Sequence, residues 1–191
     1  GETKDIEIDK NAHNWGLSED GKIATCSYCS ETKTVQVSET NEATVDKEVN
    51  EIQMPDASVA MDDKVKESIK NVGDVTLSVE KKTAGDIAVD EETKKQIGNA
   101  PVYDFNMKAK TEGGEEGSKV SFDGSMTVTV PYTLSEGEDP ENVGVYYITD
   151  KGTLEFIEAK YYEVNGKGYA TFTTTHFSYY TVVRMSAAEA C

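Results

Sequence analysis

Val120–Arg184 contains the three runs that decide the fold: V-S-F-D-G-S-M-T-V-T-V-P-Y-T-L (120–134), V-G-V-Y-Y-I-T-D-K-G (143–152) and Y-A-T-F-T-T-T-H-F-S-Y-Y-T-V-V-R (169–184). Apolar and polar residues alternate along each run, and turn-forming residues separate the runs. This pattern is typical of antiparallel strands joined by short connections. The sequence therefore predicts a mainly β, β-sandwich-like antiparallel domain.

Two short helices are predicted before this β-rich half. The first follows an N-cap at Asp62 or Asp63 and ends at Gly73. The second follows an N-cap at Asp90 and ends at Gly98. Each has one narrow apolar stripe, so we expect both to cover a sheet. The strands predicted in this part of the chain are 51–55, 74–79, 102–107, 126–132, 143–149, 154–164 and 169–175.

The aromatic residues are concentrated in the second half of the chain. Fourteen of the sixteen follow Pro101, the exceptions being Trp15 and Tyr28, so the main core is expected there. We predict a small Cys-containing hairpin segment with a linker (1–46), a β-sandwich-like module (47–186) and a truncated tail (187–191). The linker is assigned to the polar residues 38–49.

The charge balance bears on partners. The formal net charge is −17, from 36 acidic and 19 basic residues, which argues against a nucleic-acid partner because phosphates are bound by clustered Lys and Arg. No run of about 18 apolar residues is present, so no membrane insertion is expected. No charged and apolar leader opens the chain, which indicates a cytosolic protein or a processed or excised piece.

A small ligand-type cluster lies near the start. Cys26 and Cys29 flank a tight turn between predicted strands 22–26 and 32–37, and His13 precedes them beside Trp15. Zinc takes four such ligands, and Cys191 is a remote fourth candidate. A structural zinc at His13, Cys26 and Cys29 is one interpretation, and a free or disulfide-bonded cysteine pair is the other. No other cofactor is expected.

The last run contains a change of parity. Phe172 and Phe177 cannot both face the same side of one flat strand. We therefore predict a bulge or a strand break between Thr173 and His176.

The motifs V-T-V-P-Y-T-L-S-E-G-E-D-P, V-Y-Y-I-T-D-K-G and T-F-T-T-T-H-F-S-Y-Y-T-V resemble a module of Gram-positive bacterial surface proteins, found beside S-layer-homology or cell-wall attachment segments. The resemblance covers roughly residues 50–185. It implies an extracellular, bacterial cell-surface location and a β-domain without a cofactor. The implied partners are other domains of the parent protein, or a cell-wall or host glycan or protein.

The leading segment H-N-W…A-T-C-S-Y-C is similar to short repeats of such surface proteins, in which a Cys and a His-x-Trp precede a Cys-x-x-Cys-Gly hairpin. Here Ser30 stands where that pattern has glycine, and no cysteine precedes His13. By this resemblance Cys191 is the leading cysteine of a next, truncated repeat.

The triplet His176-Phe177-Ser178 resembles the self-cleaving site of β-sandwich domains in death-domain adaptor proteins and of the autoproteolytic nucleoporin. The resemblance implies that Ser178 is the nucleophile, His176 the base and Phe177–Ser178 the scissile bond. The alternative is structural, with His176 bonded to a neighbouring strand and Phe177 in the core.

Three tyrosine doublets lie on predicted strands, and each doublet directs one ring outward. Tyr147, Tyr162 and Tyr180 are the candidates for a surface that stacks on sugar or peptide; the alternative is that these rings belong to the core edge. We therefore expect a non-enzymatic module for adhesion, spacing or envelope assembly. The alternatives are a domain that cleaves itself at Phe177–Ser178 and a carbohydrate-binding module.

Overall fold

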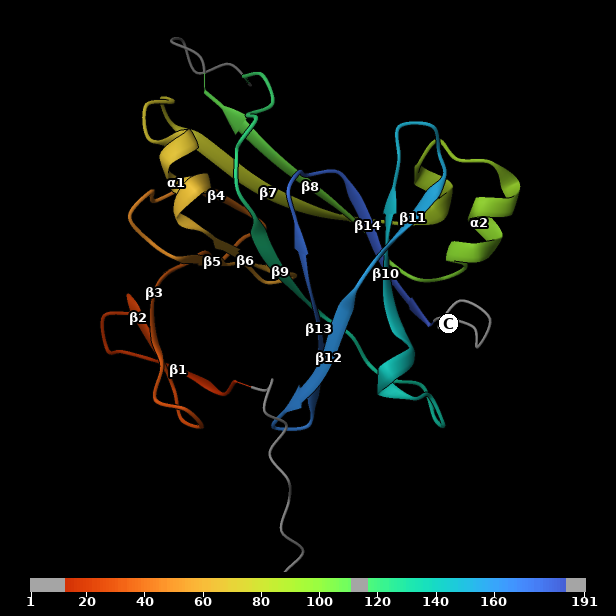
Figure 1. Ribbon diagram of the computed structural model, residues 1–191, viewed down its shortest axis with the longest axis horizontal. Coiled ribbons are helices and arrows are strands. Elements are labelled where there is room, and N and C mark those ends of the chain that lie inside the picture. The colour runs from red at the N-terminus through yellow and green to blue at the C-terminus, as the bar shows by residue number, and fades with distance from the viewer. Residues whose placement is uncertain (1–12, 111–116, 185–191) are drawn as a thin grey trace, which may run out of the picture.

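The computed structural model describes residues 13–110 and 117–184, and two β-sheets pack against each other in it (Figure 1). The predicted tail 187–191, with Cys191, lies outside the described residues. The chain is mostly β with two α-helices, so the predicted fold class is confirmed.

The first sheet has eight strands, antiparallel except for the parallel pair β3–β5. In spatial order the strands are β1 (Trp15–Leu17), β2 (Ile23–Cys26), β3 (Thr32–Val37), β5 (Glu51–Gln53), β6 (Ser58–Met61), β9 (Met126–Pro131), β13 (Lys167–Thr174) and β12 (Ala159–Val164). The sheet curls so far that residues beside its two end strands meet: Asn165 Nδ2 donates to Asn14 Oδ1 over 3.4 Å. Figure 1 shows the two end hairpins converging in this way.

The second sheet has six strands, all antiparallel. In spatial order they are β11 (Leu154–Ile157), β10 (Val143–Ile148), β14 (Tyr179–Arg184), β8 (Val102–Ala109), β7 (Val75–Lys82) and β4 (Glu42–Thr44). The long pair β7–β8 is held by eight register pairs, from Val75 opposite Ala109 to Lys82 opposite Val102.

Both predicted helices are present, but the first ends at Ile69 and not at Gly73 as predicted. In α1 (Asp63–Ile69) the N-cap Asp62 accepts a bond from the N–H of Val65. In α2 (Glu91–Ile97) the N-cap is Asp90, as predicted. None of the helices in the described residues is long and apolar enough to cross a membrane. Two short 3-10 turns complete the helical structure, Ala84–Asp86 and Pro140–Asn142.

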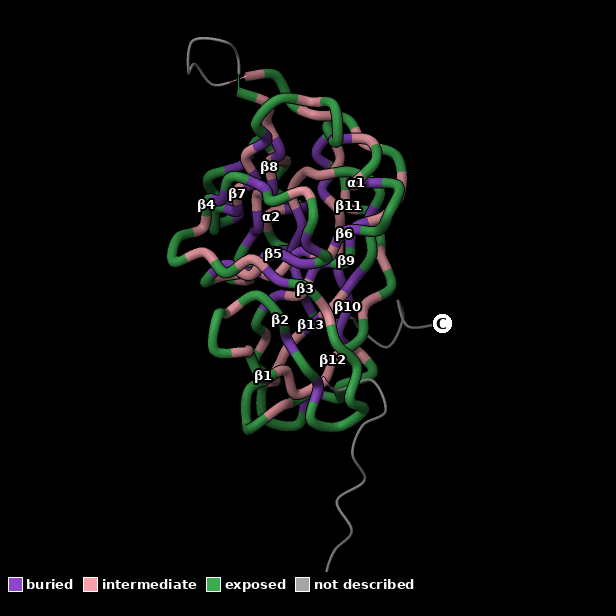
Figure 2. The backbone as a smooth tube through the Cα atoms, turned by 90° about the vertical axis from the view of Figure 1, so that its left-hand side faces the viewer, coloured by how far each residue is buried: buried purple, intermediate pink, exposed green. Residues whose placement is uncertain are grey.

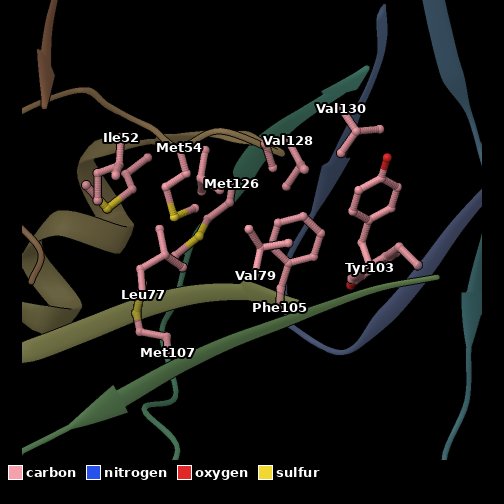
Figure 3. Packing of buried hydrophobic residues seen from close by; sticks show 14 of the residues in the cluster. Ile52, Met54, Leu77, Val79, Tyr103, Phe105, Met107, Met126, Val128 and Val130 are labelled. Carbon is pink, nitrogen blue, oxygen red and sulfur yellow. The ribbon is translucent and has the colours of Figure 1, made fainter. Parts of the chain in front are cut away.

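The main core fills the space between the sheets. Side chains at alternate positions of β9 and β5 face those of β7 and β8 (Figure 3). The residues labelled in that view are Ile52, Met54, Met126, Val128 and Val130 on one side and Leu77, Val79, Tyr103, Phe105 and Met107 on the other. Burial follows the same plan, with the buried backbone lying centrally and the exposed backbone at the rim (Figure 2). A second, smaller cluster lies beside α2: Ala84, Ile87, Ile97, Val102 and Ile148.

The predicted linker is wrong. Within residues 38–49 the chain forms β4, which pairs with β7, and Ala43 and Val45 are buried in the core. Two buried apolar residues separated by one polar residue are enough for a short edge strand. They are too few to give the alternating pattern by which longer strands are predicted. Strand pairing also crosses the predicted boundary near residue 47, because Val35 of β3 lies opposite Glu51 of β5. The small β6 strand was not predicted either.

Two segments pass from one sheet to the other. The predicted single strand 154–164 is two strands: β11 lies in the six-stranded sheet and β12 in the eight-stranded one, with Glu158 between them. The parity change before His176 is a strand break, as predicted, because β13 ends at Thr174 in one sheet and β14 begins at Tyr179 in the other. Even-numbered residues face the main core in both strands, Ala170 and Phe172 in β13 and Tyr180 and Val182 in β14, and Phe177 packs against it from the corner between them.

Candidate metal centre and the groove beside it

Three soft ligands meet at the turn of the N-terminal hairpin. One donor atom each from His13, Cys26 and Cys29 lies within 4.8 Å of the other two, and His13 Nδ1 is 3.5 Å from Cys29 Sγ. Donors around one zinc ion lie within about 4 Å of one another, so a small side-chain rotation closes the set. The carboxylate of Glu31 lies nearby, with Oε2 3.9 Å from His13 Nδ1. The predicted ligands are therefore neighbours, and Glu31 is a fourth candidate that the sequence did not single out.

The turn between β2 and β3 places both sulfur atoms. Cys26 ends β2 and is buried, whereas Cys29 is exposed. The turn is closed by a bond from the N–H of Ser30 to the carbonyl of Cys26, and the N–H of Tyr28 points at Cys26 Sγ over 3.4 Å. Ser30 has φ 63°, a left-handed conformation that glycine adopts without strain. A turn of this shape aims backbone N–H groups at the first sulfur, which favours a thiolate there.

The two thiols are inequivalent. Burial of Cys26 opposes ionisation, but bonds from the N–H groups of Cys29 and Tyr28 and from His13 outweigh it and lower the pKa of Cys26 to about 6. At Cys29 a bond from the N–H of Glu31 favours the thiolate, yet burial and the neighbouring Cys26 raise the pKa overall. Cys26 is therefore the more acidic of the two thiols.

A groove with a volume of about 800 Å³ adjoins the metal centre. It is the outer, concave face of the curled eight-stranded sheet. Its lining residues are His13, Asn14, Trp15, Lys33, Glu51, Gln53, Ser58, Ala60, Thr127, Thr129, Lys160, Tyr162, Val164, Asn165, Lys167, Tyr169 and Thr171. His13 belongs to both sites, so the hairpin that carries the ligands also forms one wall of the groove.

Trp15 joins the two sites. Its ring stacks on His13, with centroids 5.2 Å apart, and the ammonium of Lys33 lies 3.9 Å from the centroid of the same ring. Lys33 also forms an ion pair with the buried Glu51. The sequence motif His-x-Trp drew attention to His13 and Trp15, but nothing local indicated Lys33 or Glu51. Their meeting depends on the parallel pairing of β3 with β5.

The three candidate tyrosines do not form one surface. Tyr180 is fully buried, so the prediction that its ring faces a ligand is wrong. Tyr147 is half-buried and packs against the main core, and its role in a ligand surface stays a prediction. β14 is covered on both faces, since Tyr179 contacts the cluster beside α2, and neither parity of that strand faces solvent. Tyr162 does line the groove, on the other sheet, stacked on Tyr169 with centroids 5.5 Å apart.

His176, Phe177 and Ser178 occupy the corner between β13 and β14. The ring of Phe177 stacks on Phe105 and meets Phe122 edge to face, and the carbonyl of Ser178 accepts a bond from the N–H of Phe105. The ring of His176 packs edge-on against Tyr147, with centroids 4.6 Å apart.

The backbone of this corner shows neither a cis peptide bond nor a left-handed conformation at Phe177 or Ser178. These contacts match the structural alternative, and self-cleavage stays a prediction.

No family model, no curated protein and no solved structure matches the chain.

Proposed function

We propose that the protein is a non-enzymatic module of an extracellular, cell-envelope-associated bacterial protein, in which Zn²⁺ bound to His13, Cys26 and Cys29 fixes the N-terminal hairpin. The observation that carries the proposal is the approach of the three donor atoms to within 4.8 Å. The resemblance of the chain to Gram-positive surface modules supports the location. Adhesion, spacing and envelope assembly all require a rigid body that keeps its shape outside the cell.

The hairpin β2–β3 is joined to the rest of the sheet by one short pairing, since β3 and β5 share three register pairs. β1, at the margin of the sheet, contributes only three residues. A metal bound to His13 and to the Cys-x-x-Cys turn ties the residues before β1 to the connection between β2 and β3. Structural zinc contributes its binding free energy directly to folding. The ion would thus hold the outer three strands on the sheet.

Both histidines of the chain are engaged in this picture. His13 belongs to the donor set, and His176 packs on Tyr147. A serine nucleophile needs a base at hydrogen-bond distance. This supports a binding or structural role over a hydrolytic one.

Cobalt substitution tests the metal site. The reduced protein should bind one Co²⁺ with thiolate-to-cobalt charge-transfer absorption, and Zn²⁺ should displace it and raise the thermal midpoint. Cys26→Ser should abolish the absorption, and Ser27→Ala, in the same turn, should leave it intact. Cys191→Ser should also leave the cobalt absorption intact. Loss of the absorption in this variant would assign Cys191 as the fourth ligand.

Two results would reject the metal. One is a reduced protein that shows no cobalt absorption and no stabilisation by zinc. The other is a purified protein with the mass of a Cys26–Cys29 disulfide that resists reduction. Location is tested separately by co-sedimentation of the chain with isolated Gram-positive cell walls. Failure to sediment would count against the envelope role and leave the metal result unaffected.

A further inference from the structure

We propose that the groove on the outer face of the eight-stranded sheet is a binding site for an anionic saccharide chain, one that carries carboxylate or phosphate groups. The groove has a volume of about 800 Å³, within the range of sites that enclose small ligands. It runs from the hairpin that carries the metal ligands to the β12–β13 hairpin.

Strand register accounts for the floor of the groove. Side chains alternate across a strand, and in β9 Met126, Val128 and Val130 are buried in the core. Thr127 and Thr129 therefore face the opposite side, together with Thr171, which lies opposite Thr129 in β13. The floor is thus a row of hydroxyl groups, at positions where an ordinary sheet surface faces open solvent. Thr129 donates to Thr171 Oγ1 and Thr171 donates to the carbonyl of Val128, each over 3.2 Å, so these two oxygens offer lone pairs to the hydroxyl donors of a ligand.

The walls are cationic although the protein is strongly acidic. Three lysines, Lys33, Lys160 and Lys167, line the groove against one carboxylate, Glu51, and the formal net charge of the chain is −17. Lys33 and Glu51 neutralise each other in an ion pair. Lys160 and Lys167 are exposed, and within residues 13–110 and 117–184 neither forms an ion pair. Two cations without ion-pair partners in a concave site attract an anionic ligand.

Aromatic rings from two parts of the sheet line the groove. Tyr162 and Tyr169 are cross-strand neighbours on β12 and β13, stacked at an interplanar angle of 27°, and Trp15 lies on the hairpin wall. Tyrosine has an apolar face and a polar hydroxyl, which suits contact with the C–H face and the hydroxyls of a sugar ring. Lys160 lies two residues from Tyr162 on the same face, so one sugar residue can meet both a ring and an ammonium.

The position of the groove favours a saccharide over an acidic peptide. Extended peptides usually bind by adding a strand to a free sheet edge, through backbone bonds. The floor consists of β5, β6, β9 and β13, and each of them is paired on both sides, whereas the edge strands β1 and β12 form the walls. A ligand that lies along the floor is therefore bound by side chains, which are hydroxyls below and rings and ammonium groups at the walls.

Calorimetric titration of the full-length, zinc-loaded chain tests the site with four probes: hexagalacturonate, an oligomer of glycerol phosphate, neutral cellohexaose and a hexa-aspartate peptide. We expect one or both anionic polyols to bind, with affinity that falls as salt rises. The double variant Lys160→Gln/Lys167→Gln should weaken binding at least tenfold, because charge-assisted bonds are lost. The control Lys151→Gln removes an exposed lysine from the turn after β10 and should change nothing.

Each remaining outcome overturns the proposal. Equal binding of cellohexaose would show that charge plays no part, and preference for hexa-aspartate would make the groove a peptide site. Absence of binding by all four probes, or equal loss in the Lys151→Gln control, would also reject it. Both lysines are exposed, so circular dichroism and thermal melting should show the double variant folded. The cobalt assay on the same samples reports the metal site independently.

Discussion

At the residue scale, Ser30 pays a conformational cost that glycine would avoid. Its φ of 63° is required by the turn that brings Cys29 back towards Cys26. We predict that Ser30→Gly raises the free energy of unfolding by about 1 kcal/mol, because a side chain in the left-handed region is strained. Chemical denaturation of the zinc-loaded protein measures the effect.

Ser27→Gly is the matched control for that change. Ser27 lies in the same exposed turn and has no positive φ, so glycine there should lower stability by about 0.5 kcal/mol through the entropy of the unfolded chain. If both serine variants shift stability in the same direction, the conformation of Ser30 is not the reason for the gain.

Asp62 is the second residue whose role is clear. One carboxylate oxygen accepts the N–H of Val65 and the other accepts the N–H of Ser125, each over 2.8 Å, so a single side chain caps α1 and fastens the start of β9. The bond from Val65 holds the pKa of Asp62 below its ordinary range, with a smaller opposing effect of burial and further help from Ser125. Asp62→Ala should lower the free energy of unfolding by about 1–2 kcal/mol at pH 7.

The pH dependence follows from the lowered pKa of Asp62. A carboxyl group that is more acidic in the folded state stabilises the protein fully above its unfolded pKa of about 3.9, and loses this contribution as pH falls through the folded pKa. The stability difference between wild type and Asp62→Ala should therefore be constant from pH 8 to about 5 and shrink below about 4. The variant Asp62→Asn separates the hydrogen bond from the charge, because its side-chain oxygen can still accept the N–H of Val65 but the amide cannot titrate. A difference that instead grows in acid would contradict this role for Asp62.

At the element scale, the corner between β13 and β14 depends on one buried hydroxyl. Burial raises the pKa of Tyr180 to about 12, so the phenol stays protonated; its hydroxyl lies 2.5 Å from the carbonyl of His176 and 2.7 Å from Thr174 Oγ1. Tyr180→Phe removes both bonds, while Thr174 Oγ1 keeps its own bond to the carbonyl of His176 over 2.9 Å. We predict a loss of about 1 kcal/mol in urea denaturation, the net contribution of ordinary hydrogen bonds.

Tyr28→Phe controls for the Tyr180→Phe substitution, since Tyr28 is exposed, and should leave stability within about 0.5 kcal/mol of wild type. Intact mass of wild type and Tyr180→Phe after long incubation tests the self-cleavage prediction at the same corner. A fragment that begins at Ser178 would establish cleavage, and an intact chain would leave the corner with its structural role.

At the scale of the whole molecule, residues 13–46 contribute strands to both sheets. β3 extends the eight-stranded sheet, whereas β4 completes the six-stranded one and places Ala43 and Val45 in the core. We predict that residues 13–46 alone are unfolded, and that residues 47–184 are less stable than residues 38–184 by about 2–3 kcal/mol, from the lost burial of these two side chains. Amide dispersion in NMR spectra and urea denaturation measure the two effects.

Removal of β4 also leaves β7 as a free edge. An uncovered long strand invites association with another chain, so the 47–184 fragment should show concentration-dependent size in sedimentation. A monomeric 47–184 fragment as stable as 38–184 would show instead that a domain boundary does lie near residue 47.

Short stretches of sequence predicted the helix caps and the turns correctly. Asp62 and Asp90 cap the two helices because their carboxylates reach N–H groups three residues away. Asn165-Gly166 turns the β12–β13 hairpin, since both residues adopt positive φ. The Cys-x-x-Cys turn also lies where its flanking strands predict. Caps, turns and alternation act over a few residues, so the sequence by itself determined them.

Only the tertiary structure decided which strands are neighbours. Alternation shows which side chains share a face, but it does not show which sheet a strand joins, and so the exchange of sheets at Glu158 and the burial of Tyr180 escaped prediction. The groove has the same origin: Trp15 and Tyr169 are far apart in sequence and line one site because the sheet curls until Asn14 meets Asn165. Pairings of this kind are set by burial of the whole core, a property that no short stretch of sequence contains.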